Sequence, residues 1–245
     1  MSPPVIACLH HLAAPFTGHA GAAMTAAGAV LVERRLREGD PLPDLDEVDG
    51  IVSLGGEQSV VGLADEPAGT TPLVAEAALL REAVEREVPV LGVCLGAQLL
   101  AYALGGSVRR LPRRLVAWPP LKPLPAAHGD PLLGSLPLDA AGLHWNEDGF
   151  EPPPGAVELL RRPAGSAEAF RVGACAWGVQ FHAEVDEDVL EGWYRDWGAD
   201  ALPEAGVTEA AARAADATHL PGQRALSEAL FGGFARVAAA ARAAA

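Results

Sequence analysis

The chain has 245 residues, of which half are hydrophobic and a fifth are charged, so a disordered or fibrous protein is excluded for most of its length. Its 18 Lys and Arg residues against 32 Asp and Glu residues give a net charge of −14. A protein that binds phosphate backbones needs the opposite balance, so we expect no nucleic acid and no anionic membrane as a partner. The length suits one large domain or, alternatively, two small ones.

Cysteine usage and apolar segments bear on the compartment. Cys8, Cys94 and Cys175 are too few and too scattered for a disulfide framework or a four-ligand zinc site. The first ten residues lack the basic region of a secretory signal. The segment Val88–Leu104 is interrupted by proline, glycine and glutamine and is shorter than the roughly 20 apolar residues of a membrane helix. We therefore expect a cytoplasmic protein with reduced thiols.

Strands and helices alternate through the first half of the chain. The expected strands are short apolar runs, and the expected helices are amphipathic or rich in small residues. In chain order they are a strand at Val5–Leu9, a helix at Gly18–Gly28, strands at Val30–Val32 and Gly50–Leu54, a helix at Leu73–Glu87, a strand at Pro89–Val93 and a helix at Leu95–Leu104. This succession predicts a parallel sheet that is covered by helices on both faces.

The second half has a different character. Leu111–Gly134 and Gly142–Gly155 are rich in proline and turn residues, so we expect turns and irregular structure there. Short strands are expected at Ala156–Leu160, Ala167–Val172 and Cys175–Phe181, as an antiparallel or mixed extension of the same domain. The Ala-rich segment Thr208–Ala245 is expected to be helical.

The segment Val90–Gln98 is the most informative in the chain. A nucleophile at a sharp turn from strand to helix has a strained backbone, and the residues two before and two after it must be small. Gly92, Cys94 and Gly96 supply this G-x-C-x-G pattern between an apolar strand and an apolar helix. The helix N-terminus would stabilise a thiolate, and the backbone N–H of Leu95 would point to a developing oxyanion. The alternative is a buried structural cysteine in a glycine-containing turn.

A histidine and a glutamate end a later apolar strand. His182 and Glu184 lie two residues apart, so in an extended chain their side chains leave on the same face. A carboxylate beside an imidazole fixes its tautomer and supports its charged form, which allows the imidazole to deprotonate a thiol. The alternative is an unrelated surface pair at a strand end. Because Cys94 is far away in the sequence, the proximity of the three side chains has to come from the fold.

The chain resembles the class I (triad-type) glutamine amidotransferases, whose hallmark is such a nucleophile elbow followed downstream by an H-x-E motif. The resemblance spans roughly residues 5–195 and is strongest to the free-standing, GMP-synthase-like members. Further matching segments are Ser53–Gly56, Leu143–Trp145, Gly149–Phe150 and Glu168–Arg171. The resemblance implies a flavodoxin-like α/β fold with a central, mostly parallel sheet, helices on both faces and additional C-terminal helices. Residues 1–200 would form the amidotransferase domain, and residues 201–245 a helical extension packed on the same domain.

The resemblance also implies a catalytic triad. Cys94 would attack the side-chain amide of glutamine, His182 would act as general base and acid, and Glu184 would orient His182. The attack would give a thioester and release ammonia, and water would then yield glutamate.

The oxyanion loop of the family matches this chain with one departure. Gly56 and Leu95 match its two backbone donors, each typically worth about 10²–10³ in rate, and Gln98 matches a glutamine-binding position. Glu57 stands where relatives usually have proline. A carboxylate that pointed inward would repel the oxyanion, and we expect Glu57 to point to solvent instead. A second departure, Asn146–Glu147 in place of histidine and glycine, is expected to affect the choice of partner more than glutamine hydrolysis.

Other clusters indicate no metal and no cofactor. His10, His11 and His19 have no acidic or thiol partner at a metal-site spacing, and we expect ordinary strand-end and loop histidines. The arginines between Arg109 and Arg114 are expected to form a solvated rim. Trp193 and Trp197, four apart in an expected helix, are expected to pack in the core or at an interface.

Three functions remain open at this stage. The first is a glutaminase of the amidotransferase type, which would need a separate synthetase partner because the chain shows no nucleotide-binding motif. The second is a hydrolase of other γ-glutamyl amides, such as γ-glutamyl amines or peptides. The third is a catalytically idle regulatory protein, which Glu57 alone favours.

Overall fold

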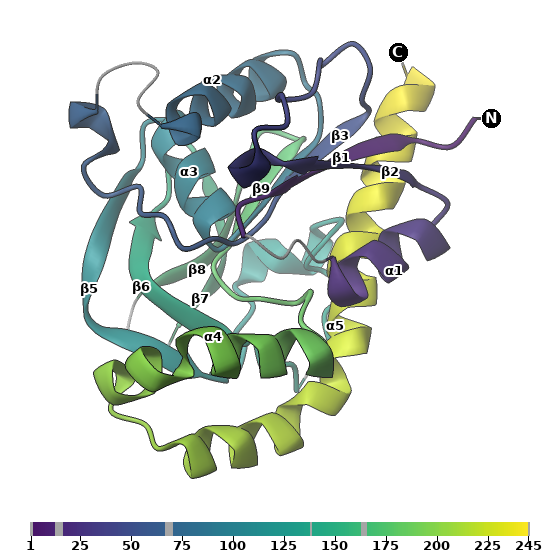
Figure 1. Ribbon diagram of the computed structural model, residues 1–245. Helices are drawn as coiled ribbons and strands as arrows, with labels where there is room; N and C mark the ends of the chain where they lie inside the picture. Colours follow the sequence, from purple (N-terminus) through teal and green to yellow (C-terminus); the bar gives the residue numbers. More distant parts are fainter. Residues whose placement is uncertain (1, 13–16, 67–70, 138, 163–165, 245) are drawn as a thin grey trace.

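The computed structural model describes residues 2–12, 17–66, 71–137, 139–162 and 166–244, and Figure 1 shows their arrangement. The strands are β1 (Val5–His10), β2 (Val30–Arg35), β3 (Gly50–Ser53), β4 (Val90–Val93), β5 (Ser107–Ala117), β6 (His144–Glu151), β7 (Val157–Arg161), β8 (Ala167–Val172) and β9 (Ala176–Val179). The α-helices are α1 (Gly18–Ala26), α2 (Pro72–Glu85), α3 (Leu95–Ala103), α4 (Glu187–Ala205) and α5 (Glu209–Ala244). Short 3-10 helices occur at Leu36–Glu38, Leu63–Asp65 and Pro125–Gly129.

A seven-stranded sheet forms the centre of the molecule, in the order β2-β1-β3-β4-β9-β8-β7. The four pairings from β2 to β9 are parallel, and the two pairings that add β8 and β7 are antiparallel. The carboxyl ends of β1, β3, β4 and β9 therefore meet at one edge of the sheet. Open α/β sheets bind ligands at this edge, so the topology already selects the region of a site.

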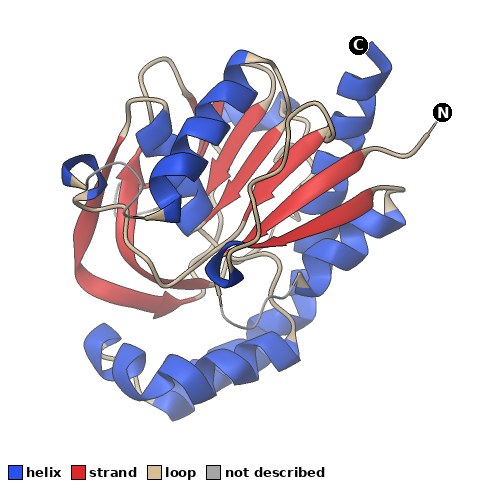
Figure 2. Ribbon diagram, turned by 45° about the horizontal axis from the view of Figure 1, so that its top comes forward, coloured by secondary structure: helices blue, strands red, loops and turns tan. Residues whose placement is uncertain are grey.

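Helices cover both faces of this sheet (Figures 1 and 2). On one face α2 and α3 close a buried cluster that includes Leu80 and Leu99. On the other face α1 and α5 close a second cluster, in which Phe231 and Phe234 of α5 are fully buried. The strands between them are apolar on both sides, as strands of a sheet covered on both faces must be.

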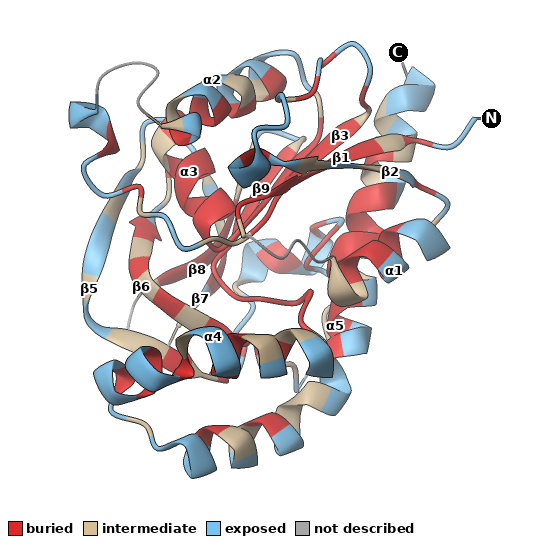
Figure 3. Cartoon of the chain, in the orientation of Figure 1, coloured by how far each residue is buried: buried red, intermediate tan, exposed pale blue. Residues whose placement is uncertain are grey.

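A third cluster lies beside the sheet, where α4 and the first part of α5 pack near β5 and β6 (Figure 3). Trp118 and Tyr194 are buried there, and both donate hydrogen bonds to Asp216 of α5, the first at 2.8 Å. The guanidinium of Arg213 lies 4.2 Å from the centre of the Tyr194 ring. These contacts fix the two C-terminal helices against the rest of the chain.

The expected elements of the first half are all present, with ends shifted by a few residues. The C-terminal helix is also present as α5, although the last residue of the expected segment, Ala245, lies outside the described residues. The expected boundary at residues 200 and 201 falls inside α4, which continues to Ala205. No described helix, including the 36-residue α5, is apolar enough to cross a membrane.

The expectation of turns throughout Leu111–Gly134 and Gly142–Gly155 is wrong for part of each segment. Residues up to Ala117 continue β5, which pairs with β6 as a separate antiparallel ribbon. Pro112 lies in the interval between Arg110 and Leu115 where the register shifts, and such an irregularity tolerates a residue without a backbone donor. The ribbon was hidden in the sequence because β5 is rich in arginine and mostly exposed, while β6 buries polar residues.

Candidate active site

Cys94 lies between β4 and α3 with a backbone φ of 51° and ψ of −105°. Such a conformation is rare for a residue with a side chain and is typical of strained functional positions. A Cβ added to Gly92 would lie 2.5 Å from the carbonyl oxygen of Gly96, and one added to Gly96 would lie 2.0 Å from that of Ser53. Both glycines are therefore required by close backbone packing, as the G-x-C-x-G pattern predicts.

His182 and Glu184 lie just beyond β9, and the expected strand Cys175–Phe181 is shorter at both ends. The two side chains nevertheless meet, with 2.6 Å between Nδ1 of His182 and Oε1 of Glu184. Both residues are buried. The sequence-predicted pair is thus formed in irregular backbone rather than in a strand.

The imidazole of His182 also hydrogen-bonds the side chain of Cys94. Burial acts to lower the pKa of His182, but the negative charges of Glu184 and Cys94 beside it outweigh burial and raise the pKa to about 10. His182 is therefore positively charged at neutral pH, and its charge favours the thiolate form of Cys94. The structure brings together all three side chains that the sequence singled out.

The loop after β3 passes directly over these side chains. A Cβ on Gly55 would lie 2.8 Å from Cε1 of His182, and one on Gly56 would lie 2.7 Å from Cδ2 of Leu95. Leu95 is the first residue of α3, so its backbone N–H belongs to the free donors of a helix N-terminus. Two glycines thus allow the loop to approach the nucleophile to within contact distance.

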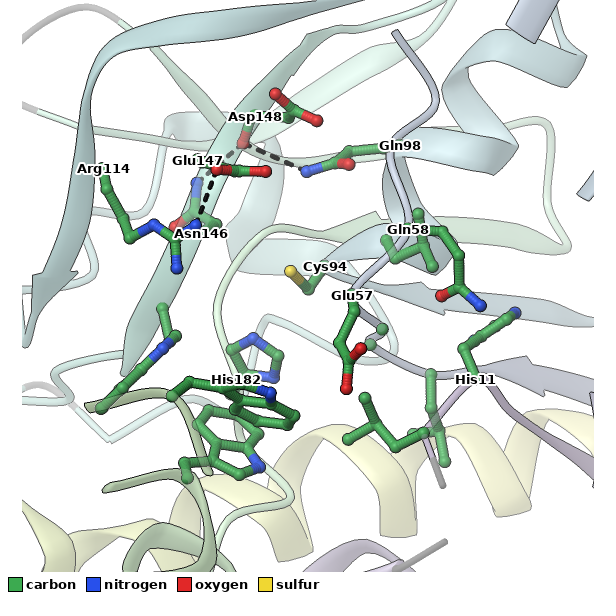
Figure 4. Close-up of a pocket in the computed structure, with 18 of the residues that line it drawn as sticks. His11, Glu57, Gln58, Cys94, Gln98, Arg114, Asn146, Glu147, Asp148 and His182 are labelled. Atoms are coloured by element: carbon green, nitrogen blue, oxygen red, sulfur yellow. Dashed lines mark hydrogen bonds and ion pairs between the residues drawn. The ribbon is translucent and has the colours of Figure 1, made fainter. Parts of the chain in front are cut away.

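Glu57, the unusual residue in this loop, forms an ion pair with Arg37 at 3.1 Å, and its side chain is 42% exposed. The expectation that it faces solvent agrees with this exposure. Its side chain lies at the border of the cavity described below, where Figure 4 shows it below Cys94. The pairing with Arg37 compensates the charge that would otherwise oppose an oxyanion.

Two buried glutamines flank the nucleophile. The side-chain amide of Gln98 donates to the backbone oxygen of Asp148 at 3.1 Å and to Oε1 of Gln180 at 3.3 Å. Gln180 in turn donates from Nε2 to Sγ of Cys94 at 3.6 Å. The sequence singled out Gln98 but missed Gln180, whose place two residues before His182 was the available signal.

A cavity of about 370 Å³ opens over Cys94 and His182 (Figure 4). Its far wall is aromatic and consists of Trp145 from β6 and Trp193 and Trp197 from α4. The ring centre of Trp193 lies 4.7 Å from that of His182, in edge-to-face geometry. Trp193 does belong to a buried cluster, as expected, but the expectation of pure packing missed that both α4 tryptophans also face the site.

The remaining sequence candidates have local partners. His10 pairs with Glu33 and His11 with Glu76, and among the described residues no group of three potential ligands surrounds a metal position. The arginine cluster is not simply solvated, because Arg110 and Arg114 both pair with Glu147 at 2.5 and 2.7 Å. Arg114 also lines the cavity.

Comparison with known proteins places this geometry in a family. The model of the class-I glutamine amidotransferases matches residues 41–191. The chain belongs to the class I glutamine amidotransferase family. Within it, the chain resembles the free-standing, GMP-synthase-like members.

Two curated relatives illustrate the family. The glutamine-hydrolysing component of the GMP synthase of Saccharolobus solfataricus is 37% identical over 153 residues, which are 59% of this chain and 72% of that protein. The glutamine amidotransferase-like protein YfeJ of Salmonella typhimurium is 29% identical over 162 residues, which are 64% of this chain and 66% of that protein. The chain matches 33% of the length of the GMP synthase of Aeropyrum pernix.

Solved structures show the same fold over nearly the whole chain. A glutamine amidotransferase from Thermotoga maritima has a TM-score of 0.80 at 23% identity, with 96% of this chain and 98% of that chain covered. One from Methylobacillus flagellatus has a TM-score of 0.79 at 26% identity, with 96% and 95% covered. The expected flavodoxin-like class I amidotransferase fold is confirmed, including its mostly parallel central sheet.

Proposed function

We propose that the chain hydrolyses the side-chain amide of glutamine through a thioester on Cys94 and supplies the ammonia to an acceptor. The observation that carries this proposal is the charged His182, held between Glu184 and the strained Cys94. This arrangement provides a preformed nucleophile together with a proton donor beside it.

The proposed reaction begins when the Cys94 thiolate attacks the amide carbon. The negative charge moves to the amide oxygen, where the backbone N–H groups of Gly56 and Leu95 would stabilise it. The imidazolium of His182 gives its proton to the nitrogen, the carbon–nitrogen bond breaks and ammonia leaves. Neutral His182 then takes a proton from water, the resulting hydroxide attacks the thioester, and glutamate leaves as the thiolate forms again. Glu184 orients the imidazole and stabilises its charge in both steps.

Gln98 is proposed to bind the amino acid part of the substrate. The support is its buried side chain beside Gln180, with its amide nitrogen on the backbone of Asp148. A fixed amide of this kind presents its oxygen in one direction, which suits recognition of an ammonium or amide group.

A separate synthetase subunit is the proposed acceptor partner. The names of three curated relatives describe each of them as one subunit of a glutamine-hydrolysing GMP synthase. We propose the same division of labour here without assigning the acceptor, because fold and triad do not select it. The free cysteines Cys8, Cys94 and Cys175 support a reducing compartment such as the cytoplasm.

Residues 1–200 are proposed as the amidotransferase domain and residues 201–245 as its extension. The support is the dense packing of α5 on α1 and the hydrogen bond from Gln223 Nε2 of α5 to the backbone oxygen of His182, 2.8 Å long. The extension is thus proposed to be part of the catalytic unit.

Glutaminase turnover of the wild-type chain and of Cys94→Ser tests the main proposal, with Cys8→Ser as the matched control. We expect loss of turnover in the first variant and normal turnover in the second. A glutamine-analogue electrophile should label Cys94 in the wild type. Equal rates in the wild type and Cys94→Ser would contradict the assignment, and failure to label, alone or with a partner, would support an idle regulatory protein.

Hydrolysis of a larger γ-glutamyl amide is a second candidate. It is favoured by the aromatic wall of the cavity, because Trp193 touches His182, the group that would protonate the leaving nitrogen. A substituent on that nitrogen would therefore extend along the tryptophans. Turnover of free glutamine against a series of γ-glutamyl amines distinguishes the two: a higher kcat/KM for a substituted amide would favour the second candidate.

A further inference from the structure

A second buried pair of histidine and glutamate lies beside the triad. Nε2 of His11 lies 2.7 Å from Oε2 of Glu76, and the hydroxyl of Ser53 donates to Oε1 of Glu76 at 2.6 Å. Glu76 and Ser53 are fully buried and His11 nearly so. The three residues come from α2, from the end of β3 and from the position after β1. The proposed hydrolysis uses none of them.

Burying a carboxylate is costly unless charged or polar partners compensate for the lost water. Aliphatic residues at these positions would fill the same space without that cost. The network therefore needs an explanation, and its position suggests one. It lies directly beneath the loop that carries Gly56.

This loop has little structure of its own. After the hydrogen bond from Leu54 N–H to the oxygen of Leu9, 3.1 Å long, the chain continues as Gly55–Gly56 outside any helix or strand. Glycine has more backbone freedom than any other residue, so such a loop does not hold an N–H group in one direction by itself. An oxyanion donor, however, has to point at the position where the charge develops.

His11 is the side chain that packs against this loop. A Cβ on Gly56 would lie 2.5 Å from Cβ of His11, and Figure 4 shows His11 on the same side of the cavity as Glu57. Burial acts to lower the pKa of His11, but Glu76 and the nearby backbone of Leu54 and Gly55 raise it overall. Among the described residues Nδ1 of His11 has no well-aligned hydrogen-bond partner, so this edge of the ring remains available to the loop.

We propose that the His11–Glu76 pair is a positioning pair for the oxyanion loop, which holds the N–H of Gly56 toward the reacting carbonyl group. This inference rests on the proposed amide hydrolysis at Cys94. His11 acts through the loop rather than by contact with the substrate, and Glu76, anchored by Ser53, fixes the position and charge of His11.

Glu76→Gln and His11→Gln test the proposal, because both retain polar side chains and remove the charged pair. Three quantities are measured for each variant: kcat, KM and the rate at which iodoacetamide alkylates Cys94. Alkylation by iodoacetamide displaces iodide and creates no oxyanion, so it reports the thiolate and His182 without the loop. Glu82→Gln, an exposed position on the same helix, is the matched control.

We expect kcat to fall about tenfold in both variants, which is less than the 10²–10³ lost when an oxyanion donor is removed outright. KM should change by less than about twofold, and the alkylation rate should equal that of the wild type. The double variant should be no worse than the more impaired single variant, because the two residues act as a unit. Glu82→Gln should behave as the wild type.

Three results would overturn the proposal. A rise in KM at constant kcat would show that His11 binds the substrate itself. An equal fall in kcat and in alkylation would show that the pair acts through the triad or the fold. Unchanged kinetics would leave the pair with no role in catalysis.

Stability and substrate choice are controlled separately. Thermal unfolding is recorded for each variant, and if one fails to fold, Ser53→Ala, which removes a single hydrogen bond to Glu76, is expected to lower kcat about threefold with normal alkylation. The assays use glutamine and its γ-p-nitroanilide analogue. If the wild type hydrolyses the anilide alone, glutamine hydrolysis fails while the positioning proposal is still tested; if it hydrolyses neither, both are overturned.

Discussion

The nucleophile and the catalytic histidine are held in opposite ways. Every constraint on Cys94 is short in range: β4 leads into it, α3 leads out of it, and two glycines allow the sharp turn. His182 lies outside regular structure, and distant elements hold it. Its backbone N–H donates to the oxygen of Leu143 at 2.8 Å, and its backbone oxygen accepts from Gln223 of α5 at 2.8 Å.

This difference indicates how the two halves of the site should fail. Damage to the nucleophile side should affect fold and chemistry together, because the same glycines serve both. Damage to the histidine side should change the chemistry while most of the fold persists, because each support contributes one contact. The predictions that follow test this contrast, from the largest expected effect to the smallest.

Gly96→Ala should abolish turnover and lower the free energy of unfolding by about 3 kcal/mol or more. The added Cβ would lie 2.0 Å from the backbone oxygen of Ser53, so α3 or β3 has to move. Chemical denaturation and glutaminase assays measure the two effects. Gly129→Ala, where a Cβ meets nothing within 4 Å, is the control and should be close to wild type. Normal stability of Gly96→Ala would refute the account of the elbow.

Glu184→Gln should lower kcat by about 10²-fold or more, because the imidazolium loses its oriented negative partner. Glu184 helps to raise the pKa of His182 to about 10, so activity in the wild type should fall as the pH rises through about 10. The substitution lowers that pKa, so the alkaline limb of the kcat profile should move to lower pH. A limb that stays in place would show that another group controls it.

The same pKa shift affects stability. The folded pKa of His182 lies above its usual value near 6.5, so its contribution to stability is fully present below that pH. It is lost as the pH rises through about 10. Denaturation at a series of pH values should therefore show a smaller decline at alkaline pH in Glu184→Gln than in the wild type.

Gln223→Leu should lower kcat about tenfold with less change in KM. The leucine leaves the buried backbone oxygen of His182 without its donor from α5, so the ring is held less well. Ser227→Ala, at a buried position one turn further along α5, is the matched control and should retain activity. Equal losses in both variants would mean that α5 supports only the general fold.

Glu57→Gln should change kcat by less than about twofold. The carboxylate is 42% exposed and paired with Arg37, so it contributes little field at Cys94. Steady-state kinetics at low and moderate salt measure the effect. A large gain in turnover would show instead that Glu57 suppresses an otherwise competent site.

The contrast between the two sides also explains what the sequence could predict. The elbow, the alternating elements and the H-x-E pair are local patterns, so Cys94, His182 and Glu184 were identifiable from spacing and residue type. The β5–β6 ribbon was not, because β5 lacks an apolar face and β6 buries polar residues that serve the site.

The supports of the histidine depend on pairings between distant segments. Gln223 lies in an Ala-rich helix whose pattern gives no sign that one amide reaches His182. Trp193 and Trp197 predict a helix face, but which element that face meets depends on how α4 crosses the end of the sheet. The His11–Glu76 pair joins the end of β1 to α2, and no spacing rule relates such positions.

The rate of alkylation of Cys94 by iodoacetamide at pH 7, compared in the wild type and in His182→Gln, tests the central claim most directly. If the imidazolium of His182 maintains the thiolate, the wild type should react at least about tenfold faster, and mass spectrometry should locate the label on Cys94. Equal rates in the two proteins, or preferential labelling of Cys175, would contradict it.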